Sequence, residues 1–139
     1  MRLRDLEAYF TKCRDRPVDM TSWEDTNANP GKTTVRGYRH VETLAEADGV
    51  WFLCPKCYVK NGGVLGTHMI AIGFSDRDCL PGSYSQDRNG VDTRWNVGGT
   101  DIDNLTLTPS IDLSQPEIVS GCDWHGFVGS NGVPPGEAA

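Results

Sequence analysis

The feature of this sequence that most constrains its fold is a pair of cysteine and histidine motifs that lie far apart in the chain. Cys54 and Cys57 form a Cys-x-x-Cys motif, and Cys122 and His125 form a Cys-x-x-His motif. Two intervening residues allow a tight turn to present both side chains to one ion, and four such donors complete the tetrahedral shell of a structural zinc site. The two motifs therefore predict a Zn²⁺ ion that ties the middle of the chain to its end.

Other interpretations of these motifs stay open. The four residues could be separate buried side chains, because a free cysteine often packs as a small hydrophobic residue. Cys54 and Cys57 could form a thioredoxin-like redox pair, although no βαβ pattern surrounds them. A catalytic zinc would keep one coordination position for water, and His68 and Asp123 would then be the candidates for proton transfer. If the zinc is not catalytic, three roles remain for His68: a ligand, a hydrogen-bond partner of a ligand, or a strand histidine with no link to the metal. We favour the last two.

Length and composition indicate one domain with a modest core. The chain has 139 residues, 37% of them hydrophobic, and its longest apolar runs are too short to cross a membrane. Five cysteines without a signal peptide favour reduced thiols over a disulfide framework. We accordingly expect Cys13 and Cys79 to be buried or incidental thiols, and the protein to be cytoplasmic.

The charge of the chain bears on its partners. A net charge of -6 argues against a surface that follows a nucleic-acid backbone, because such a surface needs clustered Lys and Arg. The basic residues near the N-terminus alternate with acidic ones, which is typical of a solvated face. We therefore expect a protein partner, with self-association as a further option, and neither nucleic acid nor a membrane.

The hydrophobic pattern predicts an α+β, β-rich fold in which short antiparallel strands form a small sheet or sandwich with one or two N-terminal helices. Leu3, Leu6, Phe10 and Cys13 recur at helical spacing, so we expect an amphipathic helix over residues 1–16. A loop over 17–40, a zinc-stabilised β-rich core over 41–128 and a flexible tail over 129–139 should follow. Within the core we expect a helix over 41–47 and strands over 50–53, 68–74, 93–97, 105–108, 118–120 and 126–128.

The order of several short motifs carries a resemblance to a known family. These motifs are Phe52-Leu53-Cys54-Pro55-Lys56-Cys57, His68, Arg94-Trp95-Asn96, Leu107-Thr108-Pro109-Ser110-Ile111, Cys122-x-x-His125-x-Phe127-Val128 and Asn131-Gly132. Over residues 50–132 the chain resembles a small, mostly phage-encoded family of unknown function whose members are often labelled ammonia monooxygenase. The resemblance implies a zinc-binding, β-rich protein of phage or prophage origin, working in the host cytoplasm, with Cys54, Cys57, Cys122 and His125 as ligands. Monooxygenase chemistry is not implied, because copper and di-iron sites need several converging histidines or carboxylates.

Two functional classes follow from these features. The favoured one is a phage or prophage accessory protein that has a structural zinc site, binds a protein partner and catalyses no reaction. The alternative is a zinc-dependent hydrolase that acts on a small or nucleotide-like substrate. A zinc-ribbon protein that binds nucleic acid is a third and weaker class, because the chain is acidic.

Overall fold

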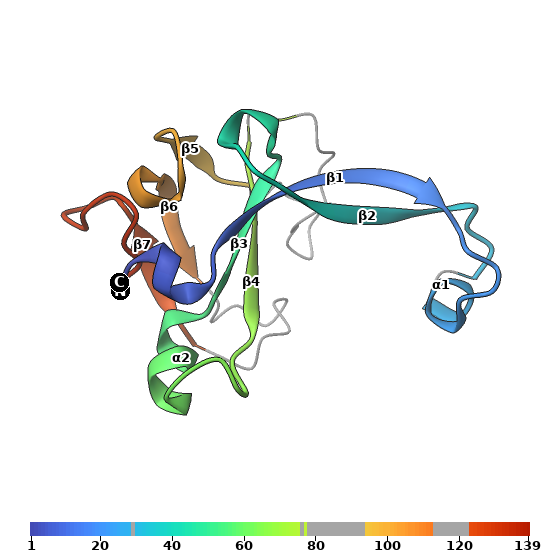
Figure 1. Cartoon of the computed structure of the whole chain (residues 1–139), viewed down its shortest axis with the longest axis horizontal. Coiled ribbons are helices and arrows are strands. Elements are labelled where there is room, and N and C mark those ends of the chain that lie inside the picture. Colours follow the sequence, from blue (N-terminus) through green and yellow to red (C-terminus); the bar gives the residue numbers. More distant parts are fainter. Residues whose placement is uncertain (29, 76, 78–93, 113–122) are drawn as a thin grey trace.

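The computed structural model describes residues 1–28, 30–75, 77, 94–112 and 123–139. In this part of the chain the strands form two antiparallel sheets, with the orders β2-β1-β3-β4 and β5-β6-β7 (Figure 1). The strands are β1 (Tyr9–Pro17), β2 (Thr34–Val41), β3 (Gly49–Leu53), β4 (Met69–Gly73), β5 (Asn96–Gly98), β6 (Thr106–Asp112) and β7 (His125–Val128). The prediction of a β-rich α+β fold built from short antiparallel strands is confirmed. Cys79, Cys122 and the strand expected over 118–120 lie outside the described residues.

The helices of the described residues are all short. They comprise the α-helices α1 (Trp23–Ala28) and α2 (Pro55–Asn61) and the 3-10 turns η1 (Leu3–Leu6), η2 (Leu44–Glu46) and η3 (Ile102–Asn104). The helix expected over 41–47 is therefore wrong except for η2, which Thr43 caps by accepting a hydrogen bond from the Glu46 N–H. Val41 pairs with Phe10 in the sheet and Gly49 already begins β3, so only a single turn fits between the two strands.

The main core joins the inner faces of the two sheets. Leu107 and Val128 of the second sheet, and Leu105 just before β6, are fully buried in one cluster with side chains of the first sheet. Ile70, Ile72 and Phe74 alternate along the chain and are all buried, as are Leu105 and Leu107. β6 nevertheless continues past Pro109 to Asp112, so the predicted end of this strand is wrong. The ladder to β7 resumes there at Ile111 after a register shift.

The predicted N-terminal helix over 1–16 is wrong beyond residue 6. Leu3, Leu6, Phe10 and Cys13 are all buried, as the hydrophobic pattern suggests, but they are buried by a 3-10 turn and a strand. Glu7 adopts a left-handed backbone conformation with a φ angle of 55°, which ends η1, and β1 begins two residues later. Pairing of β1 with two other strands supplies the backbone hydrogen bonds, so tertiary contacts override the local helical spacing.

The loop predicted over 17–40 is also wrong, because this segment builds half of a projecting hairpin. β1 and β2 pair from Phe10↔Val41 out to Pro17↔Thr34, whereas β3 pairs with β1 only up to Thr11. The two strands beyond Thr11, with the connection that contains α1, therefore leave the sheet as a two-stranded arm, which we define as residues 12–39. Figure 1 shows the arm extending away from the two sheets, with α1 at its far end.

The C-terminal tail over 129–139, which was expected to be flexible, is docked against the chain's beginning. The Leu3 N–H donates to the Gly136 carbonyl at 2.6 Å, and the Ala138 N–H donates to the Met1 carbonyl at 2.7 Å. Ala138 is buried, and the Ala139 and Phe127 backbones bond reciprocally at 3.0 Å. These bonds extend the second sheet to both termini, because backbone groups at a sheet edge favour any chain that can pair with them. The prediction of a flexible tail is therefore wrong.

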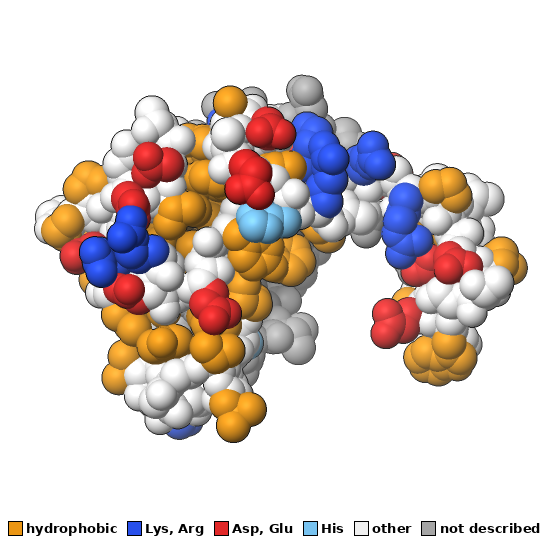
Figure 2. Space-filling view, viewed as in Figure 1, with side chains coloured by type: hydrophobic (Ala, Val, Ile, Leu, Met, Phe, Trp, Pro, Cys, Tyr) orange, Lys and Arg blue, Asp and Glu red, His pale blue; other side chains and the backbone are white. Residues whose placement is uncertain are grey.

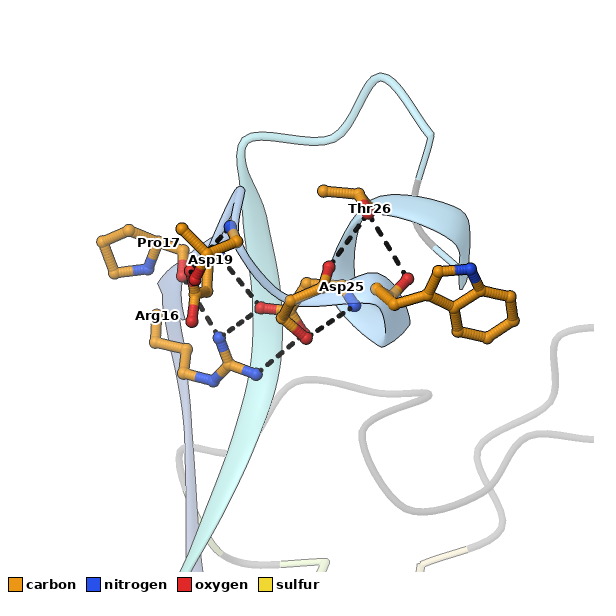
Figure 3. Close-up of polar contacts among 8 residues, drawn as sticks. Arg16, Pro17, Asp19, Asp25 and Thr26 are labelled. Atoms are coloured by element: carbon orange, nitrogen blue, oxygen red, sulfur yellow. Dashed lines mark hydrogen bonds and ion pairs between the residues drawn. The ribbon is translucent and has the colours of Figure 1, made fainter.

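The tip of the arm is held by a buried carboxylate. The Arg16 guanidinium donates to both oxygens of Asp25, at 2.6 and 3.0 Å, and the Asp19 N–H donates to the same carboxylate at 2.9 Å (Figure 3). Asp25 is 7% exposed although it lies in α1 at the end of the arm. The hydrogen bonds from Arg16, and then the one from Asp19, lower the pKa of Asp25 from 3.8 to about 2. This network joins β1 to α1 across the tip.

We expect Asp25→Asn to lower the thermal stability of the protein at pH 7, and to do so more than the matched change Glu24→Gln. The pKa of Asp25 is lower in the folded state than in the unfolded state. The carboxylate therefore makes its full contribution to the stability of the fold at any pH above the unfolded-state pKa. That contribution is lost as the pH falls from about 4 through about 2. Melting curves of the three proteins between pH 7 and pH 2 measure the effect. A difference between wild type and Asp25→Asn that stays constant over this range would contradict it.

Candidate metal centre

The first two candidate ligands lie where a buried strand runs into a helix. β3 ends at Leu53, Cys54 is the N-cap of α2, and Pro55 occupies the first helical turn, where its missing N–H is not needed. Cys57 follows in the same turn, so the helical geometry returns its side chain towards Cys54. Cys54 is fully buried and Cys57 is half-buried. The local sequence thus fixes the pair at the edge of the core.

The third member of the group is His68, which immediately precedes β4. Leu53 pairs with Met69 in the β3–β4 ladder, and the Cys54 N–H donates to the His68 carbonyl at 3.0 Å. The hairpin register therefore sets His68 beside the turn that carries both cysteines. One ligand atom from each of the three residues lies within 4.8 Å of the other two. The Nε2 atom of His68 is buried without a hydrogen-bond partner among the described residues.

This geometry suits a metal ion with little adjustment. Tetrahedral zinc with sulfur ligands at about 2.3 Å and nitrogen at about 2.0 Å needs its donors roughly 3.5 to 3.8 Å apart. Donors that lie within 4.8 Å of one another would move by about an ångström or less to reach that shell. Two thiolates and an imidazole are borderline-soft donors, which favours Zn²⁺ over Mg²⁺ or Ca²⁺. Cys54, Cys57 and His68 thus form a possible metal-binding group, and of the three readings of His68 the ligand reading fits best.

The second predicted motif is only half described. Cys122 lies outside the described residues, and His125 is not a member of the group formed by Cys54, Cys57 and His68. His125 is exposed on β7, and its Nε2 lies 2.9 Å from the Ser110 hydroxyl oxygen of β6. Asp123, the other candidate for proton transfer, is also exposed. Among the described residues the structure therefore brings His68, and not His125, to the two cysteines.

The contact between Ser110 and His125 was not expected, because no histidine is near Ser110 in the sequence. β6 pairs with β7 through Asp112↔His125, which places residues separated by a long connection on one face of a ladder. Ser110 lies two residues before Asp112 and so shares this face. The side-chain hydrogen bond links the two strands across the irregular part of the ladder, where the register shifts between Leu107 and Ile111. We assign it to holding β7 in place.

The remaining described cysteine differs from the expectation of a free thiol. Cys13 is buried in β1 as expected, but it is disulfide-bonded, whereas Cys54 and Cys57 form no disulfide. Its backbone N–H donates to the buried carboxylate of Asp48 at 3.0 Å. Cys13 is therefore unavailable as a metal ligand, and within the described residues the cysteines outside a disulfide are those of the Cys-x-x-Cys motif.

Comparisons with known proteins add no relatives to this description. No family model, curated protein or solved structure matches the chain. Among the described residues, no helix has both the length and the apolar character needed to cross a bilayer.

The signal that would have placed His68 beside Cys54 and Cys57 is the register of a hairpin. The strands expected over 50–53 and 68–74 are adjacent in the sequence, and antiparallel pairing of their ends brings residue 68 opposite residue 54. Side chains at such facing positions lie about 5 Å apart. A spacing rule that counts residues along the chain does not capture this proximity, because ten residues separate Cys57 from His68.

Proposed function

We propose that this chain is a phage or prophage accessory protein that uses a structural zinc ion to hold its core and acts by binding a protein partner. The supporting observation is the exposure of two large hydrophobic side chains at the tip of the arm, Met20 at 78% and Trp23 at 77%. Figure 2 shows hydrophobic side chains at the outer end of the arm, away from the sheets. Exposed tryptophan and methionine are typical anchors of protein interfaces.

In this proposal the zinc ion has a stabilising role. Cys54, Cys57 and His68 hold the ion, and Cys122 completes the shell as the fourth ligand suggested by its Cys-x-x-His motif. The site supports β3, α2 and β4, which form the base from which β1 leaves to build the arm. The partner-binding tip and the metal group are thus assigned to different parts of the fold.

The host cytoplasm is the compartment that fits this proposal, because it keeps Cys54 and Cys57 reduced for metal binding. The disulfide-bonded Cys13 is the observation that favours an oxidising compartment instead.

A photo-crosslinking residue placed at position 23, in host cells that express the chain, should capture the partner protein. With that partner purified, we expect Trp23→Ala to weaken binding at least tenfold, because truncating an interface tryptophan typically costs 2 kcal/mol or more. Leu65→Ala is the matched control, since Leu65 is 93% exposed but lies between α2 and β4. The melting temperature should be unchanged in both variants. Equal affinity of Trp23→Ala and wild type for the captured protein would refute the proposal.

The second candidate function, a zinc-dependent hydrolase, is favoured by one observation. The described residues supply three donors to the metal group, and catalytic zinc sites characteristically have three protein ligands and one water. Zinc-edge X-ray absorption on the purified protein separates the two functions. Three sulfur neighbours and one nitrogen support the structural site with Cys122. Two sulfurs, one nitrogen and one oxygen support the hydrolase, and substrate screening would then follow.

A further inference from the structure

The charge of the chain is unevenly distributed. β1 and β2 together contain five basic residues and one acidic residue, although the whole chain has a net charge of -6. Figure 2 shows Lys and Arg side chains gathered along the arm, next to a hydrophobic surface where the arm meets the sheet. Because surface charges act over about 10 Å at 0.1 M salt, a ligand that approaches β1 and β2 experiences the positive charge of these two strands more than acidic residues elsewhere in the chain.

This positive surface is hollowed. A groove of about 490 Å³ is lined by Lys12, Arg14, Arg16 and Arg39, together with Tyr38 and Trp51. A second hollow of about 310 Å³ shares its two aromatic residues and Arg39, and extends to Tyr9 and His40. Together the two hollows have a volume in the range of small-ligand sites. Basic and aromatic residues therefore line two adjoining hollows at the root of the arm.

Two of the cations in the groove have no counter-charge among the residues that the structure describes. Arg16 is bound to Asp25, and Lys12 lies 3.9 Å from the carboxylate of Asp48. Within the described part of the chain, Arg14 and Arg39 form no ion pair, and both are exposed. Unpaired arginines in a groove are well suited to phosphate, because the guanidinium can donate two parallel hydrogen bonds to it.

The aromatic side chains of the groove form a row. Ring centroids are 5.4 Å apart between Tyr38 and Trp51, 6.2 Å between Trp51 and Tyr9, and 5.2 Å between Tyr9 and His40. Tyr38, at one end of this row, is 38% exposed. Rings that are held by neighbouring rings and still partly exposed provide flat surfaces on which nucleobases can stack.

We propose that this groove binds single-stranded nucleic acid, with Lys12, Arg14 and Arg39 on the phosphates and the aromatic row on the bases. A cationic groove with interleaved aromatic rings is the arrangement by which unpaired strands are bound without sequence preference. A duplex fits less well, because its bases are stacked on one another and unavailable to the rings. An acidic peptide would use the arginines but not the row of rings. This function goes beyond the proposed partner binding at Trp23, and either can fail without the other.

The test is fluorescence anisotropy with a labelled 12-nucleotide oligo(dT) and the full zinc-loaded protein. With three phosphate contacts, affinity should fall about 10- to 20-fold between 50 and 200 mM salt, because the slope is about −0.7 per contact for single strands. Arg14→Glu/Arg39→Glu should weaken binding at least tenfold and flatten the salt dependence. Tyr38→Ala should weaken binding at least fivefold while leaving the salt dependence unchanged, because stacking does not release counterions.

The matched control is Arg2→Glu/Lys60→Glu, which changes the net charge equally but alters residues outside the groove. Circular dichroism establishes that each variant is folded. If Arg14→Glu/Arg39→Glu does not fold, the milder double variant Arg14→Gln/Arg39→Gln takes its place. An equal loss of affinity in the control would overturn the proposal, because binding would then follow net charge alone. It would equally be overturned if a labelled poly-glutamate peptide bound the groove and the oligonucleotide did not.

Discussion

Replacing Cys54 or Cys57 with serine is expected to remove the proposed zinc ion from the purified protein and to abolish its cooperative unfolding transition. A structural zinc ion contributes on the order of 10 kcal/mol to folding, which is comparable to the whole stability of a small domain. Zinc content by mass spectrometry and thermal melting by circular dichroism measure the two effects. Addition of a strong chelator to the wild type should lower its melting temperature in the same way.

Comparing the two serine variants distinguishes the loss of the metal from the loss of core packing, because the two cysteines differ in burial. Cys54 is fully buried in the hydrophobic cluster, so serine at this position also places a hydroxyl group in the core. Cys57 is half-buried, and its loss should destabilise the protein chiefly through the metal. Lys56→Ala, an exposed residue between the two, is the control that should keep both zinc and stability. If either serine variant retained a full equivalent of zinc, the assignment of Cys54 and Cys57 as ligands would be wrong.

Phe52→Ala is the second substitution with a large expected effect, a loss of about 3 to 5 kcal/mol in the free energy of unfolding. Phe52 is fully buried in β3, and its ring meets that of Trp124 edge to face, with centroids 6.3 Å apart and an interplanar angle of 86°. Truncation therefore removes contacts between β3 and the residue that leads into β7, and leaves a cavity in the common core.

Urea denaturation measures the effect of Phe52→Ala, with the midpoint shifted and the slope unchanged. Val59→Ala on α2 is the control, because Val59 is 70% exposed and should lose less than about 0.5 kcal/mol. A loss at Phe52 no larger than this would mean that the two sheets do not share one core. Zinc content should stay constant in both variants, which distinguishes packing from metal loss.

Net charge proved to be a poor guide to the surface of this chain. The value of -6 describes the sum over all residues, whereas the arm brings basic residues of β1 and β2 together through strand pairing. Lys12 faces Arg39 in the ladder, a juxtaposition of like charges that costs stability and that an anionic ligand would relieve. The sequence shows each of these residues in a mixed-charge context, and only the register shows that they meet.

Local patterns in the sequence correctly predicted the elements that depend on neighbours along the chain. The apolar run before Cys54 predicted β3, the alternation after His68 predicted β4, and the alternation around Leu105 and Leu107 predicted the first part of β6. The Cys-x-x-Cys spacing likewise identified two members of the metal-binding group. In each case a few consecutive residues carry the signal, because strand alternation and the helical turn repeat over that distance.

The tertiary structure alone decided the features that depend on distant pairing. The stripe from Leu3 to Cys13 is compatible with a helix, but the pairing of β1 with β2 and β3 makes its second half a strand. The tail that ends in Ala139 looked flexible by composition, yet its backbone completes a sheet edge next to Met1. His68 joins the cysteines through the register of a hairpin. Backbone hydrogen bonds between distant segments are satisfied only in the folded chain, and no local pattern of side chains records which segments will form them.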